Sequence, residues 1–239
     1  MARLERPTSE NSNPAYRFLE WKSNEKCFSY YDKEKKENVN VELPIKGLFL
    51  EHYHTVKGWH DKSESGIYSN EVYSIANEEI SVKAFKGGEI ASGIYKDIKE
   101  RIKNSGGRYT RSIYLMDEDG HIFNLQLKGA AVGGIKKEKS IDKEDVPGYS
   151  DFYRENSHLL DNQWVEITEA KGGKSGSVKY SIPLFEVGEV IDRATDELAN
   201  KAAKTLQEYI DGYRAKNIEV KEPVMAGDDE GGLIDELDL

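Results

Sequence analysis

Aromatic and basic side chains alternate at several places along this 239-residue chain. Rings beside cations suit an unpaired nucleic-acid strand, because bases stack on rings while lysine and arginine attract phosphates. Any single pair is explained more simply as a core ring beside a surface base, so the prediction rests on their joint occurrence. The pattern occurs in Trp21-Lys22, Tyr30-Tyr31-x-Lys33-x-Lys35-Lys36, Lys57-Gly58-Trp59, Lys83-x-Phe85-Lys86, Arg108-Tyr109-x-Arg111 with Tyr114, and Lys179-Tyr180.

Two groups of side chains follow from this pattern. The rings expected to stack on bases are Trp21, Tyr30, Tyr31, Trp59, Tyr109 and Tyr114. The cations expected to contact phosphates are Lys22, Lys33, Lys83, Lys86, Arg108, Arg111, Lys128, Lys174 and Lys179. Some of these rings must belong to the core of a β-rich protein, and the sequence does not distinguish them.

Signatures of catalysis give no positive support for an enzyme. His52 and His54 alternate on an expected strand near His60-Asp61, so a metal site or a metal-dependent nuclease is conceivable, but no supporting ligand spacing accompanies them. The glycine-rich stretch at residues 172–175 is followed by an expected strand, whereas a phosphate-binding loop needs a helix there. We therefore expect no catalytic residue, no metal and no cofactor.

The negative charge of the chain is concentrated at its C-terminal end. The formal net charge is −10, and residues 219–239 hold eight acids and one lysine, which leaves −3 on the rest. Apolar residues embedded in this acidic segment can dock in a pocket rimmed by bases, and the acids can mimic DNA. The residues expected to bind partners are Asp228, Asp229, Glu230, Leu233, Ile234, Asp235, Glu236, Leu237, Asp238 and Leu239.

The remaining composition favours a protein of the reducing cytoplasm. The single cysteine, Cys27, has no intramolecular disulfide partner. No apolar run approaches the roughly 18 residues of a membrane span, and the N-terminus lacks the apolar region of a signal peptide. Residues 1–13 are polar and are expected to form a flexible arm.

Most of the chain reads as strands. Alternating patterns predict strands at residues 16–22, 26–32, 39–43, 47–56, 67–75 and 80–85. Residues 108–116 and 122–128 flank an Asp-Gly turn and predict a hairpin, with Asn124, Gln126 and Lys128 on a wet face. Residues 164–170 and 178–185 predict another, and residues 133–148 are expected to form a mobile loop.

Helices are expected at three places. Ser92 is a plausible N-cap for a helix that ends at Gly106-Gly107, between strands. Residues 149–160 are short and helical or irregular. Residues 190–213 carry apolar side chains at spacings of three and four, which predicts an amphipathic helix that packs on the sheet or against another copy of itself.

The order of these elements resembles the single-stranded DNA-binding proteins of tailed bacteriophages. Residues 109–120 (YTRSIYLMDEDG) and 176–185 (GSVKYSIPLF) are similar to stretches of such proteins, and the resemblance extends as architecture over residues 14–239. It implies an OB-fold core, no cofactor, and a tail that recruits replication or recombination proteins. Tails of that family commonly finish in Phe, whereas this chain finishes in Leu239, which leaves the docking partner open.

The sequence therefore predicts a mainly β protein, an OB-like β-barrel with one helix between strands and a long amphipathic C-terminal helix. Its parts are a flexible arm (1–13), the barrel domain (14–188), the helix (189–217) and a disordered acidic tail (218–239). The expected function is sequence-independent binding of single-stranded DNA in phage replication or recombination, in the cytoplasm of a bacterial host, with a homodimer possible through the helix. The alternative is a non-enzymatic phage structural or assembly protein that binds other proteins through its sheet.

Overall fold

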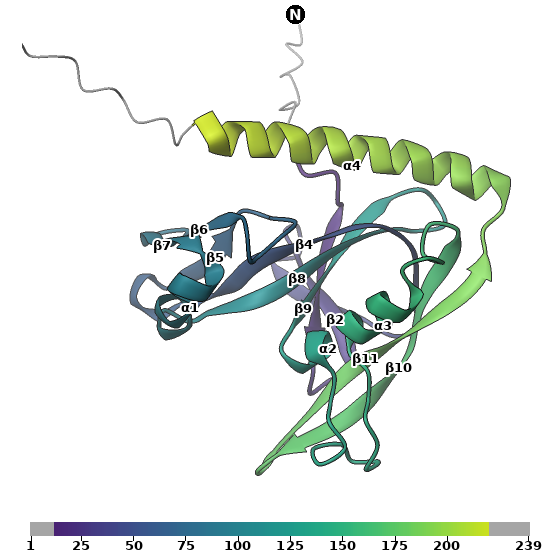
Figure 1. Cartoon of the computed structure of the whole chain (residues 1–239), viewed down its shortest axis with the longest axis horizontal. Helices are drawn as coiled ribbons and strands as arrows, with labels where there is room; N and C mark the ends of the chain where they lie inside the picture. Colours follow the sequence, from purple (N-terminus) through teal and green to yellow (C-terminus); the bar gives the residue numbers. More distant parts are fainter. Residues whose placement is uncertain (1–11, 220–239) are drawn as a thin grey trace, which may run out of the picture.

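The computed structural model describes residues 12–219 and confirms that the protein is mainly β (Figure 1). The strands are β1 (Arg17–Lys22), β2 (Cys27–Asp32), β3 (Glu37–Val41), β4 (Ile45–His60), β5 (Ser65–Ser69), β6 (Glu79–Ala84), β7 (Gly88–Ile94), β8 (Gly107–Met116), β9 (Ile122–Lys128), β10 (Gln163–Ser175) and β11 (Val178–Val190). The α-helices are α1 (Tyr95–Asn104), α2 (Ala130–Gly133), α3 (Tyr149–Asn156) and α4 (Arg193–Glu219).

The described strands form one sheet that branches at β4. The main path runs β3-β2-β1-β9-β8-β4-β5-β6-β7, and β10 joins β4 and β11. Strand β4 is 16 residues long, and β8 pairs with it along most of one edge. The first four residues of β4 also pair with β10, and the last four pair with β5. The sheet therefore divides into a large body and a lobe made of β5, β6, β7 and α1, at the left of Figure 1.

The body encloses the largest hydrophobic core. Leu125 and Leu127 of β9 lie in it with Ile113 of β8, and α2 and α3 pack against it from below the sheet (Figure 1). The sheet curls so that the turn after β1 meets β11 through the side chains of Ser23 and Ser181. Side-chain hydrogen bonds join the turn to β11, and the described strands include no pairing of β1 with β11. Closure into an OB barrel therefore remains a prediction.

Helix α4 lies across the opposite side of the sheet (Figure 1). Its buried residues, which include Ala202, Leu206 and Ile210, share a second core with Tyr53 and Tyr114 of the sheet. The apolar side of the C-terminal helix therefore packs on the sheet, which is one of the two predicted alternatives. None of the helices within residues 12–219 has the length and apolar character that a membrane span requires.

Three local predictions need correction. Ser92 belongs to β7, and α1 begins after Ile94, which makes no side-chain capping bond. Two residues of the expected wet face of β9 are buried, Asn124 (0% exposed) and Gln126 (5% exposed). The segment 133–148, expected to be a mobile loop, is closed on itself by the bridge Ile135–Val146 and tied to β10 by the bridge Ser140–Gly173.

Candidate nucleic-acid interface

The face of the sheet that α4 covers at one end continues beyond the helix as a row of basic and aromatic side chains. Residues directly opposite each other on paired strands point to the same side of a sheet. Strand pairing places Arg108 opposite Lys57, Lys57 opposite Tyr68, and Tyr68 opposite Lys83. One row across β8, β4, β5 and β6 therefore carries three cations and one ring. We call this side the basic–aromatic face.

The same face continues over the other half of the sheet. Thr110, two residues from Arg108, is opposite Lys128, and Gln126 is opposite Glu20 of β1. Lys22 follows two residues after Glu20 and therefore shares its side. Ser29 of β2 is opposite Glu20, which places Tyr31, two residues further along β2, on this face as well. The face thus extends from β2 to β6.

Several rings on this face are open to solvent. Tyr31 is 58% exposed, Trp59 56% and Phe85 73%. The ring of Phe85 stacks on Tyr68 with 4.5 Å between centroids, and it lies over Gly66, the residue opposite Trp59. A bulky apolar ring exposed to this degree is costly unless something covers it, and a nucleobase can do so by stacking.

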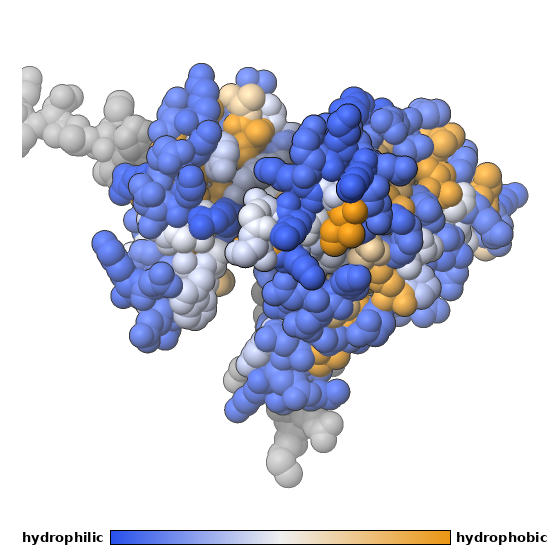
Figure 2. All heavy atoms as spheres, turned by 90° about the horizontal axis from the view of Figure 1, so that it is seen from below, coloured by the Kyte–Doolittle hydropathy of each residue, from blue (hydrophilic) through white to orange (hydrophobic). Residues whose placement is uncertain are grey.

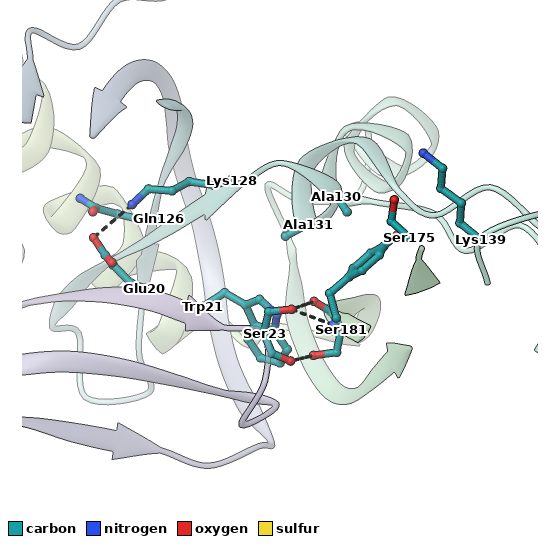
Figure 3. Close-up of a pocket in the computed structure, with 11 residues that line it drawn as sticks. Glu20, Trp21, Ser23, Gln126, Lys128, Ala130, Ala131, Lys139, Ser175 and Ser181 are labelled. Carbon is teal, nitrogen blue, oxygen red and sulfur yellow. Dashed lines mark hydrogen bonds and ion pairs between the residues drawn. The ribbon is translucent and has the colours of Figure 1, made fainter. Parts of the chain in front are cut away.

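Two adjoining clefts open at the β1–β2 end of the face. The first, of about 370 Å³, is lined by Phe18, Tyr31 and Lys33 among others. The second, of about 450 Å³, lies between the ends of β1 and β9 and the β10–β11 hairpin (Figure 3). Glu20 and Gln126 line both clefts, so the two adjoin, and together they are called the depression.

Cations outnumber acids in this depression. Its charged lining residues are Arg17, Lys22, Lys33, Lys128, Lys139 and Glu20. Glu20 lies 3.5 Å from Nζ of Lys128 (Figure 3), an exposed pair that contributes little to stability. Next to it on the face, burial lowers the pKa of the Lys57 amine, while Glu71 and Glu20 oppose that shift. The depression therefore has a positive balance suited to an anionic backbone.

A buried polar network marks the boundary between the open face and α4. Glu71 accepts hydrogen bonds from the hydroxyls of Ser112 and Tyr114, and the amide of Asn13 donates to Tyr114 at 3.0 Å. Burial raises the pKa of the Glu71 carboxyl, against the effect of these bonds. The network holds the N-terminal segment, the sheet and residue 71 together beneath α4, and so sets where the open face ends.

The structure places seven of the predicted residues on or beside this face. Lys33 lines the same cleft as Tyr31, beyond the end of β2. The residues on the face itself are Lys22, Tyr31, Trp59, Lys83, Arg108 and Lys128. They come from β1, β2, β4, β6, β8 and β9, so only the sheet brings them together.

Other predicted rings serve the interior. Tyr114 is fully buried under α4, which corrects its assignment as a stacking ring. Trp21 turns toward the main core, packs edge-on against Phe28 and donates its indole N–H to the carbonyl of Ser181. Tyr30 is half-buried beneath the guanidinium of Arg17, 4.5 Å from its ring centroid. Tyr114 therefore has no face open to a base, whereas Trp21 and Tyr30, although engaged in these contacts, still line the two clefts.

The remaining predicted cations, and the predicted ring of Tyr109, lie apart from the face. Tyr109 and Arg111 alternate with Arg108 and Thr110, so they point to the opposite side of β8. Lys174 and Lys179 are exposed and opposite each other on the β10–β11 hairpin, and Lys86 is exposed in the turn after β6. The predicted tail residues, 228–239, are outside the described part of the chain.

Sequence reasoning missed some residues of the face. Lys57 and Phe85 were part of the basic–aromatic segments, but neither was selected as a site residue. Tyr68 has no basic neighbour in the sequence, and Phe18, although it follows Arg17, was not selected. Their position beside Lys83 and Tyr31 depends on strand pairing, which a single sequence does not reveal.

The histidines do not form the conceivable metal site. Nδ1 of His52 lies 2.7 Å from the hydroxyl of Tyr149, and Nδ1 of His54 lies 2.8 Å from that of Tyr109. Within residues 12–219, the one cluster with the spacing of metal ligands is Asp117, Asp119 and His121, in the β8–β9 turn. Asp117 there accepts bonds from the backbone of residues 119 and 121, which is ordinary turn chemistry.

Comparisons with protein-family models, with curated proteins and with solved structures found no match.

Proposed function

We propose that this chain binds single-stranded DNA on the basic–aromatic face, independently of sequence. The observation that carries the proposal is the arrangement of that face, where exposed rings and cations from six strands lie on one side of the sheet. Rings such as Tyr31, Trp59 and Phe85 can stack on bases, and the neighbouring cations can track the phosphates. Nothing in this mode of binding reads base identity.

The wider setting is part of the same proposal. We take the curled body to act as an OB-like barrel, and the acidic tail to recruit replication or recombination proteins and to compete with DNA. On the resemblance to phage single-stranded DNA-binding proteins, we take this activity to belong to the cytoplasm of an infected bacterium. Homodimerisation is compatible with it, since much of the outer surface of α4 is polar and free of intramolecular packing.

The three tryptophans allow a sharp test by fluorescence. Trp164 is 6% exposed and Trp21 is engaged with Phe28 and Ser181, whereas Trp59 lies open on the face. Titration with oligo(dT) should quench tryptophan emission, and Trp59→Phe should remove most of that quenching. Binding itself, followed by the anisotropy of a labelled oligonucleotide, should survive because phenylalanine can still stack.

The matched variant is Trp59→Leu, which removes the ring from an exposed position. Loss of one stacked base costs roughly 1–3 kcal/mol, so affinity should fall roughly 5- to 150-fold. If the wild-type protein fails to bind oligo(dT) at low salt, or if Trp59→Leu binds as tightly as Trp59→Phe, this face is not the DNA-binding surface. Binding of proteins without binding of DNA would favour the assembly-protein alternative.

A further inference from the structure

A second polar cluster lies on the opposite side of β4 and β8, between α1 and α3. Nη1 of Arg111 lies 3.0 Å from Nε2 of His54, and Nδ1 of His54 lies 2.8 Å from the hydroxyl of Tyr109. Arginine can only donate, so Nε2 of His54 accepts, and the ring proton on Nδ1 is donated to Tyr109. One imidazole therefore joins the guanidinium to the phenol.

This arrangement leaves donors without acceptors. Tyr109 accepts from His54, so its own hydroxyl proton is available to a further group. Nε of Arg111 is buried and has no hydrogen-bond partner in the described part of the chain. None of the ion pairs found in residues 12–219 includes Arg111. The cluster offers several N–H and O–H groups and lacks an anion to receive them.

The surroundings keep Arg111 as the fixed positive charge of the cluster. Burial, with a smaller contribution from Arg111, lowers the pKa of His54 to about 4 and that of His52 to about 3. Both imidazoles are therefore neutral near pH 7. His52 contacts the rings of Tyr149 and Tyr153 from α3, which adds apolar surface to that side. Glu78 and Glu51 act on this cluster from a distance, but neither forms an ion pair with Arg111, and a partly buried cation is costly unless an anion pairs with it.

The cluster remains reachable from outside. Figure 2 shows this side of the molecule, where a notch separates the lobe at the left from the rest. Tyr95 of α1 and Tyr109 of β8 approach each other with 6.0 Å between ring centroids, and His52 with Tyr153 continues the cluster to α3. His54, Tyr109 and Arg111 are each partly exposed. A small ligand can therefore approach the partly exposed side chains of Tyr109 and Arg111, with Tyr95 and Tyr153 nearby.

We propose that Arg111, Tyr109 and His54 form a binding site for the phosphate group of a small phosphate monoester. The planar guanidinium can donate two parallel bonds to phosphate oxygens, and the Tyr109 hydroxyl supplies a third donor. Tyr95 and Tyr153 flank the cluster and can contact the organic part of the ligand. This site does not rest on the proposed DNA binding, because it lies on the other side of the sheet.

The test is a titration of the full-length protein with inorganic phosphate, thymidine 5′-monophosphate and thymidine, followed by NMR of the histidine ring nitrogens. The two phosphates should produce saturable shifts at His54, and thymidine should produce none. Tighter binding of the nucleotide than of inorganic phosphate would show that the nearby rings contribute. Absence of a saturable His54 shift with both phosphates overturns the site.

Variants separate the site from general charge. Arg111→Met should weaken phosphate binding roughly 10- to 100-fold, the value of one charge-assisted bond, and Arg111→Lys should weaken it less. Arg193→Met removes an exposed arginine at the start of α4, on the other side of the sheet, and should leave phosphate affinity within about twofold. Tyr109→Phe, which keeps the ring, tests the site if Arg111→Met does not fold. Unchanged phosphate affinity in the folded Arg111 or Tyr109 variants contradicts the proposal, whatever the outcome with oligo(dT).

Discussion

Ser23 and Ser181, 158 residues apart in the chain, exchange three hydrogen bonds. The Ser23 hydroxyl donates to the carbonyl of Ser181 at 2.9 Å and accepts from its backbone N–H at 2.7 Å. The Ser181 hydroxyl donates to the carbonyl of Ser23 at 2.6 Å. These contacts join the turn after β1 to β11 and hold the curled sheet around the main core.

Removal of the Ser23 hydroxyl should destabilise the protein. Ser23→Ala loses two of the three bonds and leaves the N–H of Ser181 without its partner, so the free energy of unfolding should fall by about 1–3 kcal/mol. Urea denaturation measures the change. Ser157→Ala, at an exposed position, is the matched control and should change stability by less than about 0.5 kcal/mol. Equal stability of the two variants would show that the contact contributes nothing.

Cations of the basic–aromatic face should set the salt dependence of DNA binding. The six cations on or beside it are Lys22, Lys33, Lys57, Lys83, Arg108 and Lys128. If each neutralises one phosphate, the slope of log K against log salt is about −4, at roughly −0.7 per contact for single strands. Titrations of oligo(dT) at several salt concentrations give this slope.

A charge-matched comparison tests the location of those contacts. Lys22→Gln with Lys128→Gln should make the slope shallower by about 1.4. Lys201→Gln with Lys204→Gln removes the same charge from exposed positions of α4 and should leave the slope unchanged. If the slope became shallower by a similar amount in both double variants, the effect would be a general one of net charge.

The acidic tail should weaken DNA binding when it is present. Deletion of residues 227–239 removes six acidic residues, and with them a competitor for the cationic face. Affinity for oligo(dT) should rise at low salt, and the gain should shrink as salt screens the competition. A deletion variant with unchanged or weaker affinity contradicts the predicted competition.

Stability should fall as the pH decreases from about 6.5 toward 4. His52 and His54 have a lowered pKa in the folded protein, about 3 and about 4, so below pH 6.5 the unfolded chain binds protons that the folded chain does not. Each histidine can contribute at most about 1.4 kcal/mol per pH unit in this range. Urea denaturation from pH 7 to pH 4.5 measures the slope. Replacing both histidines with Asn should flatten it, and an unaltered slope would assign the loss to other groups.

The sequence predicted the local elements better than their arrangement. The β8–β9 hairpin and the C-terminal helix follow from an Asp-Gly turn and a 3.6-residue apolar period, which are local signals. The branching at β4 depends on pairings between residues far apart, and no local pattern encodes them. For the same reason Tyr31, Trp59 and Tyr114 looked alike as exposed rings, although α4 buries only the last.

The pairing of β4 with β8 determines how the lobe is joined to the body. Gly58 is opposite Gly107, so the chain leaves the body and returns to it at neighbouring points after an excursion through residues 61–105. The whole lobe is therefore an insertion between the two strands of the β4–β8 hairpin. This excursion brings Tyr68, Lys83 and Phe85 to the basic–aromatic face, and Glu71 within it ties the lobe back to β8 through Ser112 and Tyr114, so a change in the lobe also reaches the body.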